Sequence, residues 1–139
     1  MSEQKVSELR DIFGERVRSD TSTLKAHAHD QVGDPRAWQQ PVAVVFPKSA
    51  AEVAALMRWS NETRTPVTPR GAGSGLAGAA IPVAGGVVCS FAEMNRIVEI
   101  DSENLMVTVE PGVVTNTLDK ALEPYGLFFA GYPMSEDIC

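Results

Sequence analysis

The alternation of apolar and polar residues predicts one helix at the start of the chain, followed by irregular structure. Residues 2–18 carry apolar side chains at helical spacing, namely Val6, Leu9, Phe13 and Val17. That spacing is typical of an amphipathic helix. The next two dozen residues mix polar side chains with glycine and proline, which favours a surface segment with little regular structure. We therefore expect residues 1–40 to form an N-terminal helix and an extended segment.

From residue 41 onward the pattern predicts a strand, a helix and a second strand. Residues 42–46 are a continuous apolar run, typical of a buried strand. Ser49 and Glu52 have the spacing of a capping box. The helix should end near Asn61 and bury one stripe of side chains: Val53, Leu56, Met57 and Ser60. Residues 66–68 form the second strand, and this order predicts a parallel unit with a right-handed crossover.

The remaining pattern predicts a third strand, a hairpin and a last helix. Residues 86–91 read as the third strand. Apolar and polar side chains alternate in two stretches, residues 97–100 and 105–109, which are joined by a polar turn. This pattern predicts an antiparallel pair of strands. A helix through Leu122 should follow, with Thr115 or Asn116 as its cap. Residues 41–139 are thus expected to form one α+β unit.

A glycine-rich stretch interrupts this pattern between the second and third strands. Gly71, Gly73, Gly75 and Gly78 fall within eight positions. Glycine is used where the backbone takes positive φ or approaches a ligand closely, and successive amides in such a turn can form a nest for an anion. A tight turn without a ligand needs fewer glycines, so we interpret the stretch as a diphosphate-binding loop.

Two other phosphate-binding motifs fit this stretch less well. Residues 73–78 satisfy the Gly-x-Gly-x-x-Gly pattern, but a dinucleotide-binding fold needs that pattern to open a helix. Pro82 follows too soon for a crossover helix of about 10 residues. The P-loop is excluded because no Gly-Lys-Ser/Thr is present. The loop should therefore run from strand to strand.

Composition narrows the function classes. The 139 residues suit one domain, and the net charge of −6 argues against a nucleic-acid partner. The N-terminus is charged from Glu3 onward, which predicts a cytoplasmic chain without a signal peptide or transmembrane segment. Cys89 and Cys139 lack metal or redox spacing. Histidines two residues apart, His27 and His29, are usually solvent-facing, so no metal is expected.

Several motifs follow one another in the order of a known family. They are Pro69-Arg70-Gly71-Ala72-Gly73-Ser74-Gly75-Leu76-Ala77-Gly78 with Pro82, Met94-Asn95-Arg96-Ile97, Val109-Glu110-Pro111-Gly112-Val113, Tyr125-Gly126-Leu127-Phe128-Phe129 and Pro133-Met134-Ser135. Residues 41–139 thereby resemble the PCMH-type FAD-binding domain of the vanillyl-alcohol oxidase/p-cresol methylhydroxylase superfamily. The branch they look most like contains the glycolate oxidase FAD-binding subunit and D-lactate dehydrogenase.

The resemblance implies an FAD domain of two α+β subdomains with the cofactor between them. This chain would hold the first, βαβ-containing subdomain and the start of the second. The implied FAD-binding residues are Pro69, Arg70, Gly71, Ala72, Gly73, Ser74, Gly75, Leu76, Pro111, Gly112, Pro133 and Ser135. Residues 70–76 match the diphosphate loop, whereas Pro133 and Ser135 match a segment beside the flavin. Ser74 stands where relatives with tethered FAD place a histidine, so the cofactor is expected to be non-covalent.

The resemblance also implies what the chain lacks. Relatives carry Pro-Asp-Pro-Ser-Ser where this chain has residues 131–135, Gly-Tyr-Pro-Met-Ser. The substrate domain with its catalytic residues would follow residue 139, so no catalytic residue is expected here and the chain alone should be inactive. The complete protein would be an FAD-linked oxidoreductase acting on a small 2-hydroxy acid of the glycolate or D-lactate class, with partner subunits in some relatives.

Two other functions stay open at this point. The chain could be a non-catalytic remnant or assembly module that binds no flavin alone, and absorbance in the flavin bands would separate that reading from the first. A nicotinamide-binding Rossmann domain is disfavoured by Pro82 and would be revived by a long helix starting at Gly75.

Overall fold

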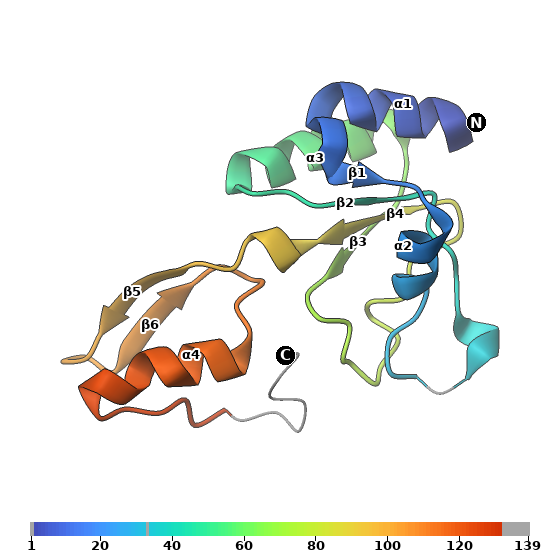
Figure 1. Ribbon diagram of the computed structural model, residues 1–139. Helices are drawn as coiled ribbons and strands as arrows, with labels where there is room; N and C mark the ends of the chain where they lie inside the picture. Colours follow the sequence, from blue (N-terminus) through green and yellow to red (C-terminus); the bar gives the residue numbers. More distant parts are fainter. Residues whose placement is uncertain (1, 33, 132–139) are drawn as a thin grey trace.

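The computed structural model describes residues 2–32 and 34–131, which form two parts joined near residue 91 (Figure 1). The first part is a four-stranded sheet with helices, and the second is a two-stranded hairpin with one helix. The predicted α+β class is confirmed. No helix among the described residues is long and apolar enough to cross a membrane.

The first sheet is built from short strands in the order β1-β2-β4-β3. Their bounds are Val17–Arg18 for β1, Ala43–Val45 for β2, Val67–Arg70 for β3 and Val87–Ser90 for β4. Strands β2 and β3 both run parallel to β4, which lies between them, and β1 pairs antiparallel with β2. The predicted parallel arrangement around a helix is confirmed, and the ends of β3 and β4 meet at one edge of the sheet.

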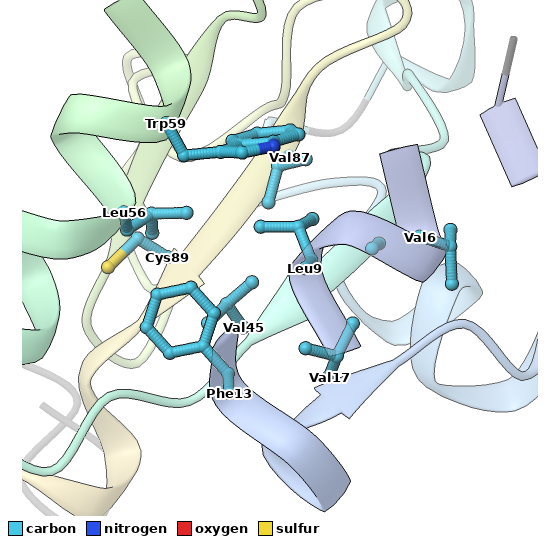
Figure 2. Packing of buried hydrophobic residues seen from close by; sticks show 10 residues of the cluster. Val6, Leu9, Phe13, Val17, Val45, Leu56, Trp59, Val87 and Cys89 are labelled. Carbon is cyan, nitrogen blue, oxygen red and sulfur yellow. The ribbon is translucent and has the colours of Figure 1, made fainter. Parts of the chain in front are cut away.

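Helices α1 (Ser2–Phe13) and α3 (Ala50–Thr63) cover the same side of this sheet (Figure 1). The side chains of the two helices pack onto those of the central strands, as Figure 2 shows for Leu9, Leu56 and Val87. The indole Nε1 of Trp59 donates a hydrogen bond to Glu8 Oε2 at 3.0 Å and links the helices. Helix α1 and Val17 therefore share one core with the strands that follow.

The N-terminal segment is more regular than the sequence predicted. Helix α1 ends at Phe13 because Gly14 takes a φ of +60°, and the 3-10 turn η1 (Gly14–Arg16) leads into β1. Val17 thus lies in a strand, and the predicted continuation of the helix to residue 18 was wrong. A second helix, α2 (Thr21–Ala26), is capped by Asp20, whose carboxylate accepts from the Thr23 amide. A 3-10 turn, η2 (Pro35–Ala37), precedes β2.

Helix α3 begins with half of the predicted capping box. Ser49 Oγ accepts from the Glu52 amide at 3.3 Å, but the Glu52 carboxylate accepts from the Lys48 amide and pairs with Arg16. The helix buries Leu56 and Trp59, whereas Met57 is 44% exposed. The buried stripe of α3 therefore includes Trp59 in place of the predicted Met57. Trp59 is a packing residue, as expected.

The second part is the antiparallel hairpin of β5 (Ile97–Asp101) and β6 (Met106–Val109), with α4 (Thr115–Leu122) beside it (Figure 1). The hairpin confirms the prediction. Val114 is the N-cap of α4, so the predicted cap at Thr115 or Asn116 was wrong. Two 3-10 turns complete the part, η3 (Phe91–Glu93) before the hairpin and η4 (Glu123–Tyr125) after α4.

Candidate functional site

The glycine-rich loop, residues 71–78, leaves the carboxyl end of β3 and contains no helix, as predicted. Gly73 and Gly78 both take a φ of +76°, a conformation that side-chain-bearing residues rarely adopt. These two positions let the chain turn sharply twice and keep the intervening residues outside the sheet.

Several backbone amides of this loop have no backbone acceptor within the described residues. Within the described residues, Gly71, Ala72, Gly73, Gly75 and Leu76 donate no backbone–backbone hydrogen bond. Backbone N–H groups are seldom left without a partner when buried, and those in a glycine-rich turn are suited to hold an anion. The loop therefore carries donors for a negatively charged group.

Open space beside two of the glycines distinguishes them from the others. A Cβ atom built on Gly71 or Gly75 meets no atom within 4 Å. At Gly73 the same atom would overlap the guanidinium group of Arg70. Neither packing nor a positive φ explains glycine at 71 and 75, so both fit a site that a ligand approaches.

A cavity of about 290 Å³ adjoins this loop and extends to the second part of the molecule. Four of the predicted cofactor-binding residues line it, namely Gly71, Ala72, Pro111 and Gly112. The structure thereby brings together two predicted segments that lie about forty positions apart in the sequence. The other lining residues are Ala92, Asn95, Val113, Val114 and Thr117, none of them charged.

Main-chain contact fixes the Pro111–Gly112 side of this cavity. The Gly112 amide donates to Met94 O at 2.8 Å, and a Cβ on Gly112 would overlap Phe91 O. Glu110 receives hydrogen bonds from the backbone N–H of Arg96 at 2.9 Å and from its guanidinium at 2.7 and 3.0 Å. These hydrogen bonds, the side-chain ones most of all, lower the pKa of Glu110. Glu110 is thereby held in place beside the Pro111–Gly112 turn.

Arg70 is buried and donates to main-chain carbonyl groups outside the loop. The residue is 8% exposed, and its guanidinium donates to His29 O at 2.6 Å and to Ala26 O at 3.4 Å. Burial lowers the pKa of Arg70, and the neighbouring Asp30 carboxylate opposes that shift. Because arginine titrates far above neutral pH, the group stays charged at pH 7.

The other predicted residues are placed as follows. Pro69 lies in β3 with its ring exposed, Ser74 is half-buried, and Leu76 is 72% exposed at the loop surface. Pro133 and Ser135 lie outside the described residues.

His27 and His29 are half-buried rather than solvent-facing, and the ring of His29 stacks on Trp38 with centroids 4.6 Å apart.

Five cavity residues were not predicted, and the sequence held a signal for only some of them. Asn95 is part of the Met94–Ile97 motif, and Val113 directly follows the Pro111–Gly112 turn. Ala92, Val114 and Thr117 carry no local signal of their own, since only the packing of η3 and α4 brings them to the cavity.

Comparison with known proteins identifies the domain. Residues 41–139 match the family described as FAD binding domain. Glycolate oxidase subunit GlcD of Bacillus subtilis (strain 168) is 41% identical over 104 residues, which are 75% of this chain and 22% of that protein. D-lactate dehydrogenase of Anaerostipes hadrus is 34% identical over 128 residues, which are 92% of this chain and 27% of that protein. The chain thus spans about a quarter of the length of either relative.

Solved structures share the same arrangement of elements. Substrate-bound p-cresol methylhydroxylase superposes with a TM-score of 0.85 at 23% identity, over 99% of this chain and 27% of that chain. A 4-ethylphenol oxidase from Gulosibacter chungangensis gives 0.79 at 28% identity, over 89% of this chain and 24% of its own. These structures share the fold of this chain, and the family match over residues 41–139 shows that the chain belongs to the FAD binding domain family.

Proposed function

We propose that this chain supplies part of a non-covalent FAD site in an oxidoreductase that oxidises a small 2-hydroxy acid. The observation that carries the proposal is the glycine-rich loop, in which Gly71 and Ala72 donate no backbone–backbone hydrogen bond and line a cavity together with Pro111 and Gly112. The amides would hold the diphosphate of FAD. The bound flavin would supply the redox chemistry, and this chain would supply its position.

The chemistry of the cavity walls supports a nucleotide. The diphosphate of FAD is anionic, and backbone N–H groups provide partial positive charge in a chain whose formal charge is −6. Ala92, Val113 and Val114 provide apolar walls that suit a planar ring, and Asn95 and Thr117 add polar groups at its edge. Such a mixture of apolar walls and few polar groups is typical of cofactor sites.

The proposed substrate class rests on the names of the relatives. They include glycolate oxidase subunit GlcD, D-lactate dehydrogenase and D-2-hydroxyglutarate dehydrogenase, and glycolate, D-lactate and D-2-hydroxyglutarate are all 2-hydroxy acids. We propose the same class for the complete protein, in which substrate contacts and any partner subunits would come from outside the 139 residues.

Gly75→Val tests the diphosphate site. The Gly75 Cβ position is open in the absence of ligand, so the variant should keep the wild-type unfolding midpoint. The added side chain would occupy the space that the diphosphate needs, and the affinity for FAD should fall at least 100-fold by fluorescence titration. Ala77→Val, an exposed residue of the same loop, is the matched control and should bind FAD as the wild type does.

Two outcomes would contradict the proposal. Gly75→Val with unchanged FAD affinity would show that the loop does not approach the diphosphate. A wild-type chain that binds no FAD at all, with its fold intact by circular dichroism, would favour the non-catalytic module instead.

A further inference from the structure

The end of strand β3 is tied to a distant part of the chain by one buried side chain. Arg70 reaches the carbonyl oxygens of Ala26 and His29, which lie 44 and 41 positions earlier in the sequence. The guanidinium is planar and offers five N–H donors in a rigid fork, so it can hold two carbonyl groups at once. The Ala26–His29 backbone is thereby fixed against the last residue of β3, which directly precedes the glycine-rich loop.

The same segment contacts the loop a second time. The Gln31 amide donates to Gly75 O at 3.0 Å. Between these two contacts, the backbone of Gly73 lies directly on the Arg70 guanidinium, because a Cβ there would overlap its Cζ and Nη2 atoms. Two contacts therefore support the loop: Arg70 lies against Gly73, and the Gln31 amide binds the carbonyl of Gly75.

Asp30 adds an electrostatic element to this support. Its carboxylate is 4% exposed, Oδ1 accepts from the Val32 amide at 2.9 Å, and Oδ2 has no hydrogen-bond partner within the described residues. A buried carboxylate close to a buried guanidinium stabilises the cation that burial alone would disfavour. The Asp30 carboxylate thereby favours the charged form of Arg70 in its buried position.

We propose that Arg70 is a positioning residue rather than a cofactor ligand, and that residues 26–31 form the support that sets the shape of the glycine-rich loop. These residues precede the range matched by the FAD binding domain family, which begins at residue 41. The link to FAD rests on the proposed function, whereas the support of the loop can be measured without any cofactor.

The first experiment measures loop order in the FAD-free chain by NMR. Arg70→Met removes the fork and keeps the aliphatic stem. The order parameters of residues 71–76 should fall from about 0.85 to below about 0.6, and exchange of the Gln31 amide should accelerate at least tenfold. Arg70→Lys keeps the charge without the fork and should give intermediate exchange. Arg36→Met, which removes an exposed arginine paired with Asp34, is the control and should change neither quantity.

The second experiment reaches the same contact from the loop side. Gly73→Ala places a methyl group against the guanidinium and should accelerate Gln31 exchange, whereas Gly71→Ala, with open space around its Cβ, should not. The effects of Arg70→Met and Gly73→Ala should be less than additive, because the first removes the group that the second displaces. The comparison of Gly73→Ala with Gly71→Ala also carries the test if Arg70→Met fails to fold.

The outcomes separate the two proposals. Unchanged loop order and unchanged Gln31 exchange in Arg70→Met would overturn the positioning role. Loss of FAD affinity in that variant with loop order intact would also overturn it, since Arg70 would then contact the cofactor directly. A wild-type chain that binds no FAD would overturn the proposed function alone, while the loop measurements would still decide the role of Arg70.

Discussion

Gly73 and Gly75 stand two positions apart in one loop, yet the protein around them constrains the first and leaves the second open. Gly73 combines a φ of +76° with the adjacent Arg70 guanidinium, so a side chain there meets both backbone strain and a steric overlap. Gly75 has neither constraint. The number of glycines was enough to predict an anion-binding loop, but it could not assign these roles, because only the folded backbone shows which Cβ would meet protein atoms.

Cys89 gives a residue-scale prediction about reactivity. The thiol lies in the buried strand β4, and burial raises its pKa from 9.0 to about 11. The thiolate is the reactive species, so a Cys139→Ser variant should react with a thiol reagent at pH 8 about 100-fold more slowly than a free thiol. The reaction should become fast in urea, and rapid labelling of the folded variant would contradict the prediction.

The raised pKa of Cys89 also makes the stability of the fold depend on pH. A thiol with a raised pKa stabilises the fold fully below its unfolded pKa of about 9. That contribution is lost as the pH rises through about 11. The urea midpoint of the wild type should therefore fall in this alkaline range more than that of Cys89→Ala.

At the scale of elements, the open end of the β5–β6 hairpin is closed by one ion pair. Arg96 directly precedes β5 and Glu110 directly follows β6, and the Glu110 amide also donates to Arg96 O at 2.9 Å. The hairpin leads into the Pro111–Gly112 turn that lines the cavity. The ion pair thus holds the turn at a fixed distance from η3.

The Glu110–Arg96 pair should make the stability of the hairpin depend on pH. The folded-state pKa of Glu110 is lowered, chiefly by the Arg96 side chain. The stabilisation is therefore present above the unfolded pKa of 4.5 and disappears as the pH falls through the lowered folded value. Urea midpoints of wild type and Glu110→Gln should differ at neutral pH and converge in acid.

Arg96→Gln is the partner control for this pair. Its urea midpoints should follow the same pH dependence, and the double variant should add little to either single change. A constant difference between wild type and Glu110→Gln at every pH would contradict the role assigned to the pair.

Long apolar patterns predicted their elements, and short elements were missed. The run at residues 42–46 and the alternation around residues 101–104 are sustained and gave strands where expected. Helix α2 has only six residues and no buried side chain, so no apolar period marks it. Strand β1 was hidden because Val17 continues the spacing of α1, and only Gly14 signals the break.

At the scale of the whole molecule, the cavity lies between the two parts, and main-chain contact within the second part fixes one of its walls. Gly112 contacts the main chain of Phe91 and Met94, and Gly71 and Ala72 of the first part line the same cavity. The sequence pointed to both segments through a resemblance, since neither hydrophobic pattern nor spacing reveals a contact between residues forty positions apart. Tertiary packing supplied the remaining lining residues.

Gly112→Ala should disturb this junction. The added methyl group would overlap Phe91 O, and overpacking of this kind costs about 1–3 kcal/mol. Urea denaturation should show that loss, together with faster exchange of the Gly112 amide. Gly71→Ala, which adds a methyl group on the opposite wall in open space, should change stability by no more than about 0.5 kcal/mol. Equal stability of the two variants would contradict the assignment.

The junction at Gly112 also bears on how this domain can diverge. The contact of Gly112 with Phe91 and Met94 is made by main-chain atoms. Exchange of the Phe91 or Met94 side chain therefore leaves these main-chain atoms in place. Replacement of a single hydrogen atom on the α-carbon of Gly112 would instead push the two main-chain segments apart.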